Sequence, residues 1–90
     1  MASGHFILYS KPGCHLCEGL EEKLRQITEV EPELEVRDIT TDNTWWGRYS
    51  LEIPVLCWSE EGREVELPRF SPRATVAHIR ARVCGYVKSS

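Results

Sequence analysis

Two cysteines three positions apart, Cys14 and Cys17, constrain this chain more than any other feature of it. They follow a short apolar run at residues 6–9 and the turn formers Pro12-Gly13, and they open a stretch with helical periodicity. Two thiols at this spacing at the start of a helix can close a disulfide, and the helix end favours the thiolate form of the first cysteine. The sequence therefore predicts thiol–disulfide chemistry at this pair.

The length of 90 residues supports one small domain, which we place at residues 1–90. A content of 41% apolar and 28% charged residues is typical of soluble globular proteins. No apolar run approaches the ~20 residues that span a bilayer, and the first residues lack the basic and apolar regions of an export signal. We therefore expect a cytoplasmic monomer with no membrane partner. In that compartment an isolated Cys-x-x-Cys pair indicates redox or metal chemistry more than a structural disulfide.

Charge is unevenly distributed along the chain. Residues 1–68 carry a net charge of −8, and residues 69–90 carry +5, from Arg69, Arg73, Arg80, Arg82 and Lys88. A basic tail can bind nucleic acid or a membrane, but these five cations form no dense cluster. We interpret them as the exposed side of a helix, where cations suit the C-terminal end of the helix dipole. We expect no nucleic-acid partner.

Hydrophobic periodicity predicts strand, helix, strand and short helix in the first half of the chain. The run at residues 6–9 is typical of a central strand buried on both faces. The amphipathic helix that follows would end before Pro32, and its apolar face would consist of Leu16, Leu20, Leu24 and Ile27. Residues 34–39 predict a second strand and hence a right-handed parallel βαβ unit. Asp42 or Asn43 would cap a short helix that carries two tryptophans.

The second half of the chain predicts a hairpin and a last helix. After Ile53-Pro54, residues 55–58 form another continuous apolar run, and residues 64–67 alternate in polarity beyond a turn at 60–62. Glutamates on this outer strand would discourage pairing at the sheet edge. Ser71-Pro72 would open the final helix, whose apolar face would be Val76, Ile79 and Val83 and which Gly85 can end.

Two motifs make the chain resemble the thioredoxin superfamily, and within it the small glutaredoxin-like proteins. The first is Tyr9-Ser10-Lys11-Pro12-Gly13-Cys14-His15-Leu16-Cys17. The second, Tyr49-Ser50-Leu51-Glu52-Ile53-Pro54-Val55-Leu56, is similar to the segment that bears the family's cis-proline. Their separation and the element order also match. The resemblance implies an α/β thioredoxin-like fold with a mixed four-stranded sheet in the order 2-1-3-4 and helices on both faces.

The resemblance also implies a role for individual residues. Cys14 would be the attacking thiol and Cys17 the resolving one, in a disulfide reductase that needs no bound cofactor and no metal. Its partners would be a protein or low-molecular-weight disulfide and an electron donor, which could be glutathione, another thiol or a reductase. The substrate-binding residues would be Tyr9, Lys11, Ile53 and Pro54. Lys11 matches a lysine near the glutathione carboxylate, and Pro54 would be cis and face the cysteines.

The segment after the predicted fourth strand departs from the family pattern. Typical glutaredoxins place a Gly-Gly pair and a Ser/Thr-Asp there, which hold glutathione. This chain instead reads Leu67-Pro68-Arg69-Phe70-Ser71-Pro72-Arg73. Arg69 or Arg73 is the alternative contact for an anion.

Other interpretations of the cysteines stay open from the sequence. Cys14, Cys17, His15 and His5 are nominal metal ligands, but structural zinc usually takes a second ligand pair that this chain lacks. An iron–sulfur cluster shared between two copies through Cys14 is a second hypothesis. A redox-inactive adaptor that binds a partner through the surface at residues 45–49 is a third.

The remaining cysteines and the aromatic cluster need separate interpretations. We expect Cys57, in an apolar strand, to behave as a small buried hydrophobe, whereas the exposure of Cys84 is open. We expect the aromatic side chains before the Ile-Pro motif to pack the short helix onto the sheet. The alternative is that one ring lines a substrate groove beside Cys14. The cluster consists of Trp45, Trp46 and Tyr49.

Overall fold

The computed structural model describes residues 4–87, so residues 1–3 and 88–90, with Lys88 among them, lie outside it. The elements follow the predicted order, with two short 3-10 helices (η1 and η2) added. They are β1 (Gly4–Ser10), α1 (His15–Arg25), η1 (Glu31–Glu33), β2 (Leu34–Asp38), η2 (Ile39–Thr41), α2 (Asn43–Tyr49), β3 (Val55–Glu60), β4 (Arg63–Glu66) and α3 (Val76–Val87). None of the helices in residues 4–87 has the length and apolar character needed to cross a membrane.

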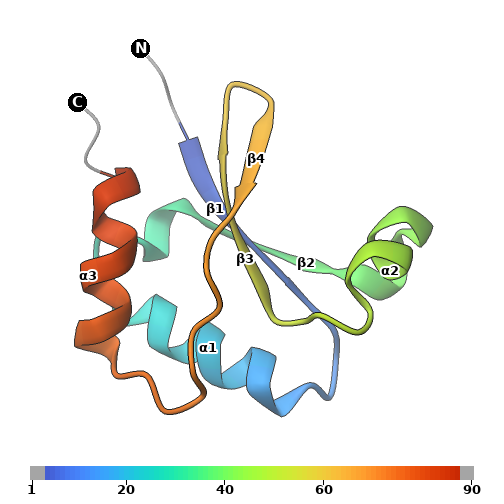
Figure 1. Cartoon of the computed structure of the whole chain (residues 1–90), viewed down its shortest axis with the longest axis horizontal. Coiled ribbons are helices and arrows are strands. Elements are labelled where there is room, and N and C mark those ends of the chain that lie inside the picture. Colours follow the sequence, from blue (N-terminus) through green and yellow to red (C-terminus); the bar gives the residue numbers. More distant parts are fainter. Residues whose placement is uncertain (1–3, 88–90) are drawn as a thin grey trace.

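The four strands form one mixed sheet in the order β2-β1-β3-β4, which confirms the prediction (Figure 1). β1 pairs in parallel with β2 and antiparallel with β3, so Leu8 has Val36 on one side and Leu56 on the other. β3 and β4 form the predicted hairpin. Its two-residue turn has φ of 51° at Glu61 and 81° at Gly62, and such left-handed pairs are typical of tight hairpin turns.

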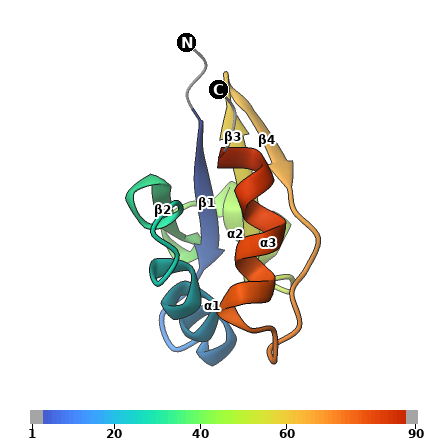
Figure 2. The same ribbon diagram turned by 90° about the vertical axis from the view of Figure 1, so that its left-hand side faces the viewer.

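Helices cover both faces of the sheet, as predicted. Figures 1 and 2 show α1 and α3 together on one side and α2 apart from them. Alternate residues of β1 lie on opposite faces of the sheet, because successive side chains of a strand point in opposite directions. Phe6 and Leu8 belong to the core under α1 and α3, with Leu24, Ile79 and Val83. The second core, under α2, contains Ile7, Tyr9, Ile39, Tyr49, Val55 and Cys57.

Helix α1 keeps the predicted periodicity but not its whole predicted apolar face. Leu24 and Ile27 are buried, and Leu20 packs against the same core. The helix ends at Arg25, so Ile27 belongs to the turn that follows. Leu16 was expected in the core, and that expectation is wrong: its side chain is 56% exposed. It lies in the first turn of α1, beside a cavity described below.

Helix α3 begins later and ends later than the sequence predicts. The Ser71 hydroxyl accepts a hydrogen bond from the N–H of Arg73 in a turn, so Ser71 does not cap the helix. Thr75 does so instead, because its hydroxyl oxygen accepts from the N–H of His78 over 3.1 Å. The helix continues through Gly85 to Val87. The predicted apolar face of α3 is confirmed at Ile79 and Val83, which are buried.

Candidate redox site

The loop between β1 and α1 places the cysteine pair at the start of a helix. Gly13 has φ of +81°, a left-handed conformation that glycine adopts more readily than other residues. The N–H of Cys14 donates to the carbonyl of Lys11 over 3.3 Å and closes the turn. Cys14 is thereby the N-cap of α1, with an extended backbone, and Cys17 lies one turn into the helix.

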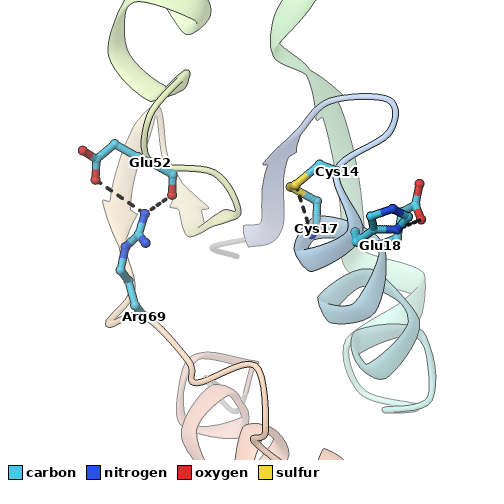
Figure 3. Close-up of a disulfide and its surroundings, with 6 residues drawn as sticks. Cys14, Cys17, Glu18, Glu52 and Arg69 are labelled. Carbon is cyan, nitrogen blue, oxygen red and sulfur yellow. Dashed lines mark hydrogen bonds and ion pairs between the residues drawn. A yellow bond between two sulfur atoms is a disulfide. The ribbon is translucent and has the colours of Figure 1, made fainter.

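Cys14 and Cys17 are joined by a disulfide, with their Cα atoms 5.3 Å apart (Figure 3). The Sγ atom of Cys14 also accepts a hydrogen bond from the backbone N–H of Cys17 over 3.2 Å. The pair is asymmetric in its access to solvent. Cys14 is half-buried, whereas Cys17 is only 1% exposed. One sulfur is thus open to a partner and the other is covered by the fold.

The electrostatic surroundings of Cys14 combine a helix end with a few exposed charges. Unpaired N–H groups and the macrodipole make the start of a helix a favourable place for negative charge. The ammonium of Lys11 lies 5.8 Å from the centre of the Trp46 ring, at the edge of this loop. His15 and Glu18 face each other at 3.8 Å and are mostly exposed, so they affect Cys14 weakly.

The segment at Ile53 and Pro54 lies on the other side of a cavity from the cysteine helix. The peptide bond between these two residues is cis. Both residues line a cavity of about 350 Å³, and so do His15 and Leu16, which follow Cys14 directly. The structure therefore brings the two sequence motifs to one cavity.

Sequence reasoning missed two contacts that hold the walls of this cavity. The guanidinium of Arg69 donates to the backbone carbonyl of Glu52 and lies 3.5 Å from its carboxylate (Figure 3). The ammonium of Lys23 donates to the carbonyls of Pro72 and Ala74, at 3.0 and 2.7 Å. These bonds tie the segment after β4 to the Ile53–Pro54 loop and to α1. Arg69, expected as an anion contact, is therefore already paired.

Tyr9, expected among the substrate-binding residues, does not line this cavity. Its side chain is 2% exposed and belongs to the core under α2. Its hydroxyl donates to the carboxylate of Glu64 over 2.6 Å and accepts from Arg37 over 3.0 Å. Burial, and next the bond to Glu64, raise the pKa of Tyr9. Tyr9 on β1 thus links side chains from β2 and β4, the two edge strands of the sheet.

The aromatic cluster packs mainly onto the sheet, as expected. Tyr49 is buried and stacks on Tyr9 with ring centres 4.3 Å apart, and the Trp45 ring meets Tyr9 edge-on at 5.8 Å. Arg37 lies 5.1 Å from the centre of the Trp45 ring. Trp46 differs from the others, since it is 45% exposed beside Lys11.

The two other cysteines are free thiols with different surroundings. Cys57 is buried, which confirms the prediction for it, and its burial raises the pKa to about 11, with Glu64 and Glu66 adding to the effect. Cys84 is half-buried on α3. Within residues 4–87, no group of three or more His, Cys, Asp and Glu side chains is placed to hold a metal ion. His5, one of the nominal ligands, pairs with Glu35 at 3.0 Å.

The pattern of a known protein family covers most of the chain. Residues 5–83 match the family described as glutaredoxin-like domain (DUF836). The chain belongs to this glutaredoxin-like family. Comparison with curated protein sequences gives no significant match. The glutaredoxin-like family and the Cys14–Cys17 pair together support a redox protein of thioredoxin fold.

Solved structures agree with the glutaredoxin-like assignment of the fold. The structural-genomics target protein XcR50 from X. campestris has a TM-score of 0.63 and 28% identity, over 89% of this chain and 96% of that one. Maleylacetoacetate isomerase from Anaeromyxobacter dehalogenans, solved with glutathione in its active site, has a TM-score of 0.52 and 18% identity. This match covers 91% of the glutaredoxin-like chain but 39% of the isomerase, and at that identity it shows the fold alone.

Proposed function

We propose that this domain is a thiol–disulfide oxidoreductase that reduces protein or low-molecular-weight disulfides through Cys14 and Cys17. The observation that carries the proposal is the position of the Cys14 sulfur. It caps α1 and accepts the N–H of Cys17, and Cys14 is half-buried, whereas Cys17 lies covered one turn below. A nucleophilic thiolate needs this combination of access and nearby positive potential.

The reaction uses two exchange steps. The Cys14 thiolate attacks one sulfur of the substrate disulfide, whose S–S bond breaks, and the first substrate thiolate leaves and takes a proton from water. The Cys17 thiolate then attacks the Cys14 sulfur in the mixed disulfide and displaces the second substrate thiolate. Two electrons pass to the substrate, and the Cys14–Cys17 disulfide seen in the structure remains. A thiol donor, glutathione or another, or a reductase restores the dithiol.

The surrounding residues would orient the substrate and favour the thiolate. The backbone of Ile53, next to Pro54, would pair with the chain of a bound disulfide across the cavity that both motifs line. The Lys11 ammonium would raise the local positive potential at the loop. The reaction needs no bound cofactor, and we expect the domain to work as a cytoplasmic monomer.

The test compares wild type with Cys14→Ser, Cys17→Ser and the double variant in reduction of insulin and of a small mixed disulfide. We expect turnover by wild type and none by Cys14→Ser. Cys17→Ser should stop at a covalent adduct with substrate, visible by mass spectrometry, because the resolving thiol is absent. Wild type with no turnover above Cys14→Ser would reject the proposal. Iron and visible absorbance in anaerobically purified protein would favour cluster binding instead.

A further inference from the structure

The cavity beside Cys14 has a size suited to one or two side chains. Its volume of about 350 Å³ is near the lower end for small-ligand pockets. It lies between the first turns of α1, the Ile53–Pro54 segment and residues 69–72 after β4. His15 and Leu16 line it, so the cavity adjoins the first turn of α1, the helix that Cys14 caps.

The free surface of this cavity is mostly apolar. The Leu16 side chain, at the rim of the cavity, is 56% exposed. It is the one exposed leucine within residues 15–25. Apolar area in such a position is favourably covered when an apolar group binds. The other apolar residues that line the cavity are Leu20, Ile53, Pro54, Phe70, Pro72 and Ile79.

The two permanently charged side chains in the lining are already engaged. Arg69 donates to the backbone carbonyl of Glu52 and pairs with its carboxylate, which balances its charge. Lys23 uses two of its three N–H donors on the carbonyls of Pro72 and Ala74. Only the Nη2 atom of Arg69 makes its contacts with Glu52, so an anion entering the cavity would have to compete with the Glu52 carboxylate for the guanidinium.

We propose that this cavity is a subsite for an uncharged apolar side chain next to the disulfide of a protein or peptide substrate. This inference rests on the proposed function and narrows its substrate class. It also implies that oxidised glutathione, which brings carboxylates beside its disulfide, is a poor substrate. The pairing of the cationic side chains and the apolar lining both favour an uncharged occupant, because burying a carboxylate without a partner is costly.

The experiment uses matched peptides that each carry one cysteine in a disulfide with a small neutral thiol. One has leucine beside the cysteine and the other has glutamate, and oxidised glutathione is the third substrate. We expect wild type to show kcat/KM about tenfold or more higher for the leucine peptide, as burial of one leucine side chain suggests. Oxidised glutathione should be no better than the glutamate peptide.

A matched pair of variants tests whether the cavity causes this preference. Leu16→Asn changes the rim, whereas Leu51→Asn makes the same change at a leucine that is 95% exposed and does not line the cavity. We expect Leu16→Asn to reduce the preference several-fold. Leu51→Asn should keep both the preference and the wild-type rate with hydroxyethyl disulfide. A preference unaffected by Leu16→Asn would overturn the inference.

A binding measurement separates this inference from the proposed function. The same peptides with serine in place of cysteine are titrated into the oxidised protein, and NMR chemical shifts are followed at Leu16 and Phe70. Selective shifts with the leucine peptide support the subsite even when no disulfide is turned over. Equal kcat/KM for both peptides, or equal shifts with both, overturns the subsite and leaves the reductase proposal standing.

Discussion

The backbone N–H of Cys17 donates a hydrogen bond to the Sγ atom of Cys14 across 3.2 Å. The donor belongs to the first turn of α1, where N–H groups lack partners within the helix. When the disulfide is reduced, the same N–H faces the freed sulfur. The helix end can therefore stabilise negative charge on Cys14.

This geometry predicts that the Cys14 thiolate forms at lower pH than in a free cysteine. Glu18 places a negative charge in the same helical turn, so Glu18→Gln should lower the pH midpoint of Cys14 alkylation further, by about half a unit. The measurement is site-resolved alkylation by mass spectrometry across pH, in a Cys17→Ser background. Glu22→Gln, an exposed change farther along α1, is the control. An unchanged or raised midpoint in Glu18→Gln would contradict the argument.

The hydroxyl of Tyr9 predicts a measurable contribution to stability. In Tyr9→Phe the carboxylate of Glu64 and the guanidinium of Arg37 lose their shared partner, so the free energy of unfolding should fall by about 1–2 kcal/mol. Urea denaturation followed by far-UV circular dichroism measures it. Tyr86→Phe is the control, since this half-buried hydroxyl makes no hydrogen bond within residues 4–87. Equal effects of the two changes would disprove the role of the network.

The ion pair between Glu29 and Arg80 makes stability depend on acidity. Arg80 donates to both carboxylate oxygens of Glu29, and this hydrogen bonding lowers the pKa of Glu29 from 4.5 to about 2. A carboxyl group with a lower pKa in the folded state stabilises the fold above its unfolded pKa and loses that effect as pH falls. Glu29→Gln should therefore flatten the decline of the unfolding free energy between pH 4.5 and pH 2.

Urea midpoints measured across this pH range test the prediction for Glu29. Glu33→Gln removes an exposed carboxylate that forms no ion pair within the described part of the chain, and it should keep the wild-type slope. Because the Glu29 and Arg80 side chains are 36% and 55% exposed, we expect the difference to shrink at high salt. A wild-type slope in Glu29→Gln would show that other carboxylates cause the acid sensitivity.

The free thiols should differ in reactivity. Burial raises the pKa of Cys57 to about 11, so few of its molecules carry the thiolate at mildly alkaline pH, and its side chain is 1% exposed. In the Cys14→Ser, Cys17→Ser double variant, we expect Cys84 to react with Ellman's reagent in the folded state. Cys57 should react only after urea is added. Fast reaction of both thiols in native buffer would contradict the prediction.

The elements in the centre of the sheet were predictable because their sequence patterns follow burial directly. Residues 6–9 are apolar throughout, and in the structure they contact the cores on both faces. Asp42 was one of two candidate caps, and its carboxylate accepts the N–H groups of Thr44 and Trp45. Local signals of this kind depend on neighbouring residues, so one sequence is enough to find them.

The errors arose where spacing alone does not determine the surroundings. Leu16 and Leu24 both fit the four-residue spacing of the predicted apolar face, but Leu24 lies in the core, whereas Leu16 lies at the cavity in the first turn. Ser71 and Thr75 are both suitable helix caps, and only the path of the backbone selects Thr75. Tyr9 meets its acceptor, Glu64, 55 positions away.

The cavity walls depend on contacts that leave no signal in the sequence. Arg69 and Lys23 both donate to backbone carbonyls, a group that every residue carries, so no residue type marks the acceptor. The family resemblance placed Lys11 and the Ile53–Pro54 segment near the cysteines, and the structure brings that segment to the cavity. Neither the residue types in the sequence nor the family resemblance predicted that residues 69–72 line this cavity.

The support of α1 by residues far along the chain has a consequence for synthesis. Lys23 binds carbonyls about fifty positions later, and Ile79 and Val83 of α3 complete the core that contains Phe6 and Leu24. Cys14 and Cys17 therefore leave the ribosome long before α3 exists to cover their helix. Until then the nascent chain presents bare apolar side chains and two unprotected thiols to the cell.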